Sequence, residues 1–343
     1  MARAVTLRDV AQLAGVSLST ASRVLNGSTR SVGEQLRHRV TAVARELDYA
    51  PNAPARAMVR GHVDVVGVVV HDIDDPYFSA VASGVMRRAE RTGLLVAVSS
   101  TLRRPERDAD YVAAFRRQRV RAVILVGSRT TDRVELERLR TEVERFQATG
   151  ARVAAVSQPH LPVDSVVVEN QAGAQELAGE LVGLGYRRFA VLAGPATLAT
   201  ARDRLAGFRA GFARHGVSLP EEHVIPGEFT RDGGYAAMRR ALRQGLDVEC
   251  VCAVNDVMAV GALAALRDQG LRLPAGIAVT GFDDIATARD VTPRLTTVRV
   301  DLEQLGDAAL HLVLSDPVEV PRVRRLRGRV VIRESTPPLR HRL

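Results

Sequence analysis

The sequence predicts an all-α head, a short hinge, and an α/β body of two lobes, each built on a parallel sheet. Apolar residues in the head recur at the spacing of short amphipathic helices. From residue 63 onward, Val- and Ile-rich runs alternate with helical stretches, a pattern typical of parallel sheets covered on both faces. The chain has 343 residues and is therefore too long for one ordinary core.

The first helix is predicted over residues 6–14. Thr6 is a good N-cap and Asp9 follows it three residues later, as in a capping box. Gly15 then allows the left-handed turn that ends the helix, and Ser17 can cap the next one. The apolar face of this helix comprises Leu7, Val10, Ala11 and Ala14.

A second helix is predicted over residues 18–26 and a third over about 34–47. The second helix has an apolar side of Ala21, Val24 and Leu25, a polar side of Ser19, Ser22, Arg23 and Asn26, and Leu18 at the border. Short helices with a Gly-containing turn between the first two describe a helix-turn-helix head. Residues 49–60 then form a connector that contains Pro and Ala.

The body contains two series of predicted strands, separated by helical stretches. The first series comprises 63–70, 94–99, 121–126, 152–157 and 165–168, and the second comprises 188–193, 223–226, 249–254, 276–281 and 296–300. Two series indicate two α/β lobes. Ligands of such lobes are expected at the carboxyl ends of the strands.

Charge is distributed unevenly along the chain. Residues 1–60 contain nine Arg and four acidic residues, whereas 61–317 contain 31 Arg and 33 acidic residues. A basic head on a near-neutral body indicates a nucleic acid as the partner of the head. Residues 318–343 are also basic, and we interpret them as a solvated surface with contact to DNA as the alternative.

Composition also excludes several protein classes. The N-terminus has no apolar segment of a signal peptide, and no apolar run reaches the roughly 18 residues of a membrane helix. The only cysteines, Cys250 and Cys252, are too few for a disulfide framework and without clustered histidine partners for zinc, so we interpret them as core residues. We expect a cytoplasmic protein without membrane contact and without a cofactor.

The chain resembles the lac repressor (LacI/GalR) family over nearly its whole length and in order. The head sequence TLRDVAQLAGVSLSTASRVLNG at 6–27 is similar to the DNA-binding signature of that family, and ELDYAPNAPARAM resembles its hinge. Further matches in the body are DIDDPYFSAVASGV at 72–85, ARDRLAGF at 201–208, AVNDVMAVGAL at 253–263, GFDDIATARDVTPRLTTVRVD at 281–301 and VIRESTPP at 331–338. The resemblance implies a helix-turn-helix domain at 1–50, a hinge at 51–61 and, at 62–343, a two-lobed periplasmic-binding-protein-like domain of two Rossmann-like subdomains.

The resemblance also implies sequence-specific binding to double-stranded DNA. The second helix of such a head lies in the major groove, so Leu18, Ser19 and Arg23 are predicted to read bases, with Arg23 placed to pair bidentately with guanine. For Leu18, packing against the head's own core remains the alternative. The remaining predicted contacts position the head on the backbone: Thr6, Ser17, Thr20, Ser22 and Asn26.

The hinge of the family folds on DNA and enters the minor groove. By resemblance Asn52 caps this helix, Ala55 contacts DNA, and Met58 stands where the family usually has Leu, as a wedge between base pairs. An eight-residue helix is not stable alone in water, so two hinges are required together. We therefore expect a homodimer on a palindromic operator.

In the family an effector binds between the lobes. Its binding changes the angle between the lobes, and this change alters the affinity for DNA. The matching positions are Tyr77, Phe78, Gln158, Arg204, Phe229, Asn255 and Asp283. Aromatic rings there would stack on the apolar face of a sugar-like ring, and polar groups would bind its hydroxyls. Gln158 departs from sugar-binding relatives, which often have Asp at this position. Asn255 as a simple helix cap and Asp283 as a loop acid remain alternatives.

Three other functions compete with that of a repressor with a small-molecule effector. A solute-uptake protein would have similar lobes but needs a secretory signal and has no use for residues 6–60. An enzyme is disfavoured because no GxSxG, HExxH, P-loop or CxxC motif occurs. A regulator controlled by a protein corepressor rather than a small molecule remains the main alternative.

Overall fold

The structure is a computed structural model that describes residues 5–26, 32–49 and 61–339. By its contacts the chain divides into two units, Met1–Asp64 and Val65–Leu343. The first unit contains the head, and the second contains both lobes of the body. In the described part of the chain, no helix is long and apolar enough to span a membrane.

The head consists of α1 (Leu7–Leu13), α2 (Leu18–Asn26) and α3 (Glu34–Glu46), as the sequence predicts. Thr6 caps α1 in a complete capping box with Asp9, and Gly15 has a φ of 64° at the end of the helix. The three helices enclose a small apolar cluster of Val10, Ala11, Ala14, Ala21, Val40 and Ala44. The cluster buries the predicted faces of α1 and α2 and leaves the polar side of α2 outside it.

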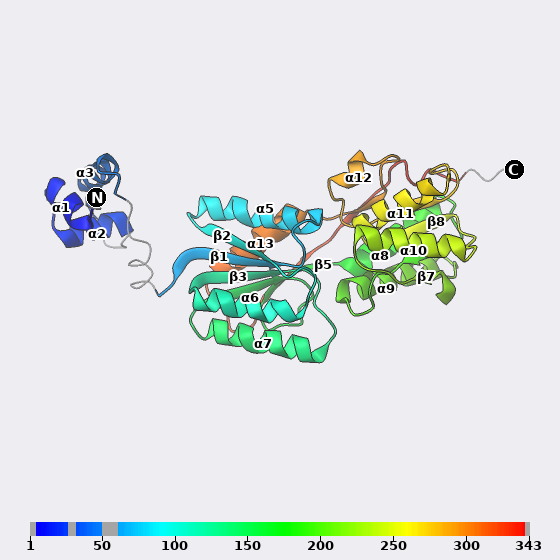
Figure 1. Cartoon of the computed structure of the whole chain (residues 1–343), viewed down its shortest axis with the longest axis horizontal. Helices are drawn as coiled ribbons and strands as arrows, with labels where there is room; N and C mark the ends of the chain where they lie inside the picture. The colour runs from blue at the N-terminus through cyan, green and yellow to red at the C-terminus, as the bar shows by residue number, and fades with distance from the viewer. Residues whose placement is uncertain (1–4, 27–31, 50–60, 340–343) are drawn as a thin grey trace. The chain divides into compact units, whose positions relative to one another are not determined.

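The first lobe contains a six-stranded sheet with the order β11-β5-β4-β3-β1-β2. Its strands are β1 (Val63–Val70), β2 (Leu95–Ser100), β3 (Val120–Val126), β4 (Arg152–Val156), β5 (Asp164–Val168) and β11 (Val323–Leu326). Its helices are α5 (Pro76–Arg91), α6 (Glu106–Arg117), α7 (Arg133–Gln147) and α13 (Leu302–Leu314). Figure 1 shows α5 and α13 on one face of the sheet and α6 and α7 on the other.

The second lobe contains a four-stranded parallel sheet with the order β7-β6-β8-β9. Its strands are β6 (Phe189–Leu192), β7 (Val224–Ile225), β8 (Cys250–Ala253) and β9 (Ala278–Thr280). Its helices are α8 (Asn170–Gly183), α9 (Ala199–Arg214), α10 (Arg231–Arg243), α11 (Asp256–Asp268) and the short α12 (Thr287–Asp290). Cys250 and Cys252 are free thiols buried in β8, which agrees with their interpretation as core residues.

The prediction for 296–300 needs a correction. A strand forms there, β10 (Thr297–Arg299), but it does not extend the parallel sheet of the second lobe. It pairs antiparallel with β12 (Arg329–Val331) in a separate two-stranded sheet. The reason is that β10 leads the chain out of the second lobe toward α13, and β12 brings it back after β11.

The late segments of the chain therefore complete the first lobe. Helix α13 packs on α5, and β11 pairs in parallel with β5. The helices approach closely because each has a glycine against the backbone of the other: a Cβ built on Gly84 would lie 1.9 Å from the Glu303 carbonyl oxygen, and one on Gly306 would lie 2.0 Å from that of Val81. The chain thus passes between the two lobes more than once, and β10 and β12 lie in two of these connecting segments.

Candidate functional site

The exposed side of α2 carries the predicted base-reading residues. Ser17 caps the helix, because its Oγ accepts a hydrogen bond from the Thr20 backbone N–H at 3.1 Å. Arg23 donates from Nη2 to the Ser19 Oγ at 3.3 Å, so the two side chains lie together on the surface. Leu18 is 48% exposed and lies outside the apolar cluster of the head. Leu18 therefore does not pack in the head's own core, and its contact with DNA stays a prediction.

The other predicted DNA contacts are less completely described. Thr6 is exposed at the start of α1, and Ser22 is half-buried on α2. Asn26 is the last residue of α2, and its side chain lies outside the description. Asn52, Ala55 and Met58 lie outside the described residues, so the predicted hinge contacts stay predictions.

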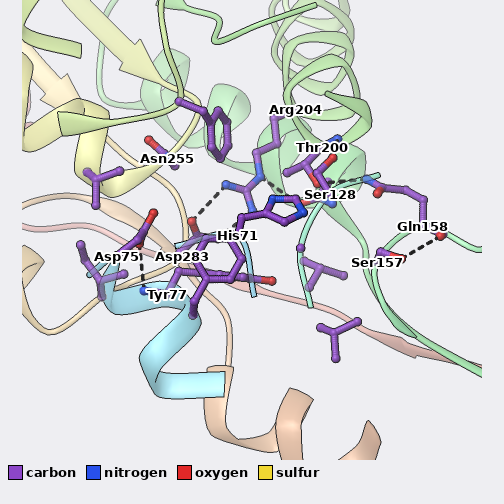
Figure 2. A pocket seen from close by; sticks show the side chains of 18 of the residues that line it. His71, Asp75, Tyr77, Ser128, Ser157, Gln158, Thr200, Arg204, Asn255 and Asp283 are labelled. Atoms are coloured by element: carbon purple, nitrogen blue, oxygen red, sulfur yellow. Dashed lines mark hydrogen bonds and ion pairs between the residues drawn. The ribbon is translucent and has the colours of Figure 1, made fainter. Parts of the chain in front are cut away.

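The body contains a cavity between its lobes with about 660 Å³ of empty space, its open mouth included. Parallel strands of both lobes end at this cavity, as expected for α/β folds. It brings together every residue predicted for effector binding: Tyr77, Phe78, Gln158, Arg204, Phe229, Asn255 and Asp283. Figure 2 shows these polar groups converging from α5, from α9 and from loops of both lobes.

Arg204 of α9 lines the cavity, and its residue is 3% exposed. Its Nη2 donates to the Asp283 Oδ1 at 2.7 Å, and its Nη1 donates to the Val254 carbonyl at 2.7 Å and to the Asp283 Oδ2 at 3.2 Å. Its Nε donates to the Asn170 Oδ1 at 2.9 Å, and its guanidinium carbon lies 3.8 Å from the centre of the Phe282 ring. These contacts use four of the five N–H donors of the guanidinium and fix Asp283 in place.

Asp283 follows β9 in a left-handed backbone conformation, with a φ of 115°. Burial raises its pKa to about 6, although Arg204 opposes the shift. Asn255 caps α11 through its Oδ1, which accepts from the Met258 N–H at 3.0 Å. The capping interpretation of Asn255 is thus correct for one atom, and the residue lines the cavity as well.

Aromatic side chains form the apolar wall. The rings of Tyr77 and Phe78 meet edge to face with centres 5.1 Å apart, at the start of α5. Phe229 packs against Gly194, where a Cβ would lie 2.8 Å from the Phe229 ring. Burial raises the pKa of the Tyr77 hydroxyl, which keeps this group protonated as a donor.

Gln158 follows β4 and reaches the second lobe. Its Nε2 donates to the Thr200 Oγ1 at 3.1 Å and to the Asp203 Oδ2 at 2.9 Å. The residue is 8% exposed, and its Oε1 is buried without a partner. A buried acceptor without a donor is costly, so this oxygen is a candidate contact for a ligand.

Several lining residues were not predicted from the sequence: His71, Asp75, Ser128, Ser157, Asn170 and Thr200. Position alone could have indicated His71 and Ser128, because they follow β1 and β3 at the carboxyl ends of the strands. The same signal applies to Asn170, which follows β5, whereas Thr200 gave none, because it lies in α9 well after the end of β6. In the described ranges, no group of three or more His, Cys, Asp or Glu residues could hold a metal ion.

Behind the cavity, Asp256 is fully buried at the start of α11. Its Oδ1 accepts from the Thr297 hydroxyl at 2.7 Å and its Oδ2 accepts from the Ile285 N–H at 2.9 Å. Burial raises its pKa to about 7, with nearby Asp283 adding to the shift. Between about pH 4 and pH 7, the folded protein therefore favours a proton on Asp256 that the unfolded chain releases.

We expect Asp256→Asn to flatten the dependence of stability on pH. Because the folded pKa is raised, the wild-type free energy of unfolding falls as pH rises from about 4 to about 7, by an amount on the order of 3 kcal/mol for this group. Urea unfolding followed by circular dichroism at several pH values measures the slope. Asp290→Asn, at an exposed site, is the matched control and should keep the wild-type slope. An Asp256→Asn slope equal to that of wild type would contradict the prediction.

Comparison with known proteins identifies the architecture. Residues 6–52 match the bacterial regulatory proteins of the lacI family, and residues 178–336 match a periplasmic binding protein-like domain. The transcriptional regulator GalR of Escherichia coli K12 is 31% identical over 339 residues, which cover 97% of this chain and 97% of GalR. The chain belongs to the LacI family.

Other relatives of this LacI-family protein are regulators as well. The ribose operon repressor of Escherichia coli K12 is 32% identical over 313 residues, covering 90% of this chain and 92% of the repressor. The lac repressor dimer bound to operator and the anti-inducer ONPF has a TM-score of 0.82 and 28% identity, covering 98% of this chain and 100% of that one. The complex of the regulator CelR with cellobiose has a TM-score of 0.71 and 29% identity, covering 96% and 99%. This LacI-family chain is thus a DNA-binding transcriptional regulator and not an enzyme.

Proposed function

We propose that the protein is a repressor that binds a palindromic operator as a homodimer and responds to an uncharged, sugar-like effector in the interlobe cavity. The similar lac repressor is a dimer on its operator, which supports the first part. The cavity supports the second part, because it combines an aromatic wall with a few polar groups. A protein corepressor would have no use for such a lining.

The observation that carries the effector class is the pairing of charges around the cavity. Arg204 is paired with Asp283, and Arg103 is paired with Asp72 and with Asp75. His71 is neutral, because burial and neighbouring arginines hold its pKa well below the usual range. Among the described lining residues no cation is left for a phosphate or a carboxylate, so an uncharged ligand fits best.

On the DNA side, we propose that Leu18, Ser19 and Arg23 read bases while Thr6, Ser17, Thr20, Ser22 and Asn26 contact the backbone. The hydrogen bond between Arg23 and Ser19 keeps the guanidinium close to the helix surface in the free head. On DNA the fork of Arg23 is available for the O6 and N7 of a guanine. Asn52, Ala55 and Met58 are proposed to complete the contact through the hinge.

We expect Arg23→Ala to weaken operator binding by about 1–3 kcal/mol and to relax the preference at one base pair of each half-site. The slope of affinity against salt should stay mostly unchanged, because the lost contact is to a base. Arg37→Ala on α3 is the matched control, with the same change of charge and no change in base preference. Titration of labelled operator and random duplexes at several salt concentrations measures the loss of affinity and the salt slope. Equal losses on the two duplexes would contradict the assignment of Arg23.

The experiment that tests the whole proposal begins with selection of DNA sites from a random pool by the full-length chain. The selected site should be palindromic, and the protein should bind it as a dimer. The complex is then titrated with D-ribose, D-galactose, cellobiose, adenosine and hypoxanthine, with ribose 5-phosphate as the charged control. We expect an uncharged compound to change operator affinity and the charged control to have no effect. Silence across this panel, or a response to the phosphate alone, would overturn the effector class.

A further inference from the structure

A chain of three polar residues, the buried Asp108 and Arg129 and the half-buried His71, lies next to the cavity and is not part of the predicted site. Asp108 of α6 accepts a hydrogen bond from the Arg129 Nη1 at 2.7 Å. The Arg129 Nη2 lies 3.2 Å from the Nε2 of His71, which lines the cavity. Arg129 is 2% exposed, so this charge is held inside the first lobe rather than at its surface.

The chemistry of arginine assigns the proton on His71. A guanidinium has only donors and stays charged in proteins, so the Nε2 of His71 must accept. A neutral imidazole with an accepting Nε2 carries its hydrogen on Nδ1. For Nδ1 we find no protein partner within the described residues. The Nδ1–H group is therefore the donor that His71 has available, and His71 lines the cavity.

The position of Arg129 is itself well determined. Its Nε and Nη2 both donate to the Gly127 carbonyl, at 3.1 Å and 2.9 Å. Gly127 has a φ of 120°, and a Cβ there would lie 2.9 Å from the Cε1 of His71 and 2.9 Å from the ring of Phe78. The missing Cβ at Gly127 thus leaves room for the His71 and Phe78 rings beside the backbone that anchors Arg129.

Gln158, which also lines the cavity, has the complementary polarity. Its Nε2 is used by Thr200 and Asp203, so only its unpartnered Oε1 is available to a ligand. The cavity therefore presents a donor at His71 and an acceptor at Gln158. Neither group can reverse its role while its protein partners stay in place.

We propose that Arg129 is a positioning residue that fixes His71 as an obligatory donor, and that His71 and Gln158 together determine effector specificity. The inference rests on the proposed effector site. The effector must carry an acceptor oxygen or nitrogen facing His71 and a hydroxyl or N–H group facing Gln158. A compound that lacks either group leaves a buried polar atom unpaired and is rejected.

The first test reads the proton directly and needs no ligand. The full-length chain is labelled with ¹⁵N in its histidine rings, and the His71 signals are assigned by their loss in His71→Asn. At pH 7 we expect a neutral ring with the hydrogen on Nδ1. A ring protonated on Nε2, on both nitrogens, or exchanging equally between the two forms would overturn the proposal.

The role of Arg129 is tested in the double variant Asp108→Asn with Arg129→Met, which removes both buried charges together. We expect the His71 signals to change to an average of the two neutral forms. An unchanged Nδ1-protonated ring would show that Arg129 does not set the tautomer. If the double variant does not fold, the wild-type spectrum still decides the proposal.

The second test compares His71→Asn with His71→Phe, titrated with the uncharged panel compound that binds the wild type. The asparagine amide places an N–H group near the position of Nδ1, whereas phenylalanine keeps only the ring. We expect His71→Asn to bind within a few-fold of wild type and His71→Phe to lose at least tenfold. Equal losses, or an unaffected His71→Phe, would overturn the proposal. If no panel compound binds the wild type, the proposed effector function itself is overturned. If a compound binds but the His71 ring is not protonated on Nδ1, only this further inference is overturned.

Discussion

Replacing Arg204 with methionine is expected to lower the free energy of unfolding at neutral pH by about 3–5 kcal/mol and to abolish effector binding. The side chain is 3% exposed and neutralises Asp283, which is buried as well. Without the guanidinium, the Asp283 carboxylate and the Val254 carbonyl both lose their charged donor. Methionine keeps much of the volume, so the loss reports electrostatics rather than a large cavity.

The deficit of the Arg204→Met variant should depend on pH. Arg204 opposes the rise in the pKa of Asp283, which is about 6 in the wild type, so its removal raises this pKa further. Below pH 6 the carboxyl is protonated in both proteins, and the charge no longer distinguishes them. The difference in stability should therefore be small at pH 5 and grow as pH rises to 8. Urea unfolding followed by circular dichroism measures it, since the chain contains no Trp.

A double variant separates the charge from the other contacts of Arg204. Asp283→Asn in the Arg204→Met background removes the orphaned carboxylate, so it should recover about 2 kcal/mol at neutral pH. In the wild-type background, the same substitution should not stabilise the protein. If Asp283→Asn gave no recovery in the variant, the ion pair would not be the source of the loss. A deficit independent of pH would lead to the same conclusion.

Gly306→Ala is expected to destabilise the first lobe by about 3 kcal/mol, at the upper end of what overpacking costs. The new Cβ would lie 2.0 Å from the Val81 carbonyl oxygen and 2.8 Å from the Val85 nitrogen. Both atoms belong to the backbone of α5, so no side chain can move aside. The helices α5 and α13 must separate, and this shifts the start of α5, where Tyr77 and Phe78 form the cavity wall.

Gly183→Ala provides the matched control for Gly306→Ala. Gly183 also lies in a helix, but a Cβ there has nothing within 4 Å. Alanine should leave stability unchanged or raise it by up to about 1 kcal/mol, through the lower entropy of the unfolded chain. Thermal and urea unfolding of both variants test the contrast. Equal behaviour of the two variants would mean that the close approach of α5 and α13 is not required.

Local patterns were sufficient to predict the head and most strands. Thr6 with Asp9 predicted a capping box, and the apolar spacing of Val10 and Ala11 predicted the buried face of α1; both are confirmed. The continuous runs in the body predicted buried strands such as β1 and β3, also confirmed. These features succeed because capping and periodicity depend on residues only a few positions apart.

The predicted effector residues all line one cavity, although their roles in binding stay predictions. Arg204, Asn255 and Asp283 came from motif resemblance, which does not reveal hydrogen-bond partners. The arrangement in which Arg204 spends its donors on Asp283, Asn170 and Val254 appears only when α9 packs beside the strand ends. That arrangement, and not the residue types, is what supports the proposal of an uncharged ligand.

Sequence patterns thus established the three-helix head and the alternation of strands and helices in the body, and motif resemblance supplied seven of the nineteen residues that line the cavity. Long-range packing determined the features that the sequence did not predict. Helix α13 and strand β11 return to the first lobe, and β10 pairs with β12. Asp108, Arg129 and His71 form one hydrogen-bonded chain. Periodicity indicates which side of a helix or strand is buried, but it does not indicate which other element packs against that side. The proton on His71 follows from a neighbour 58 positions away, which only the folded chain supplies.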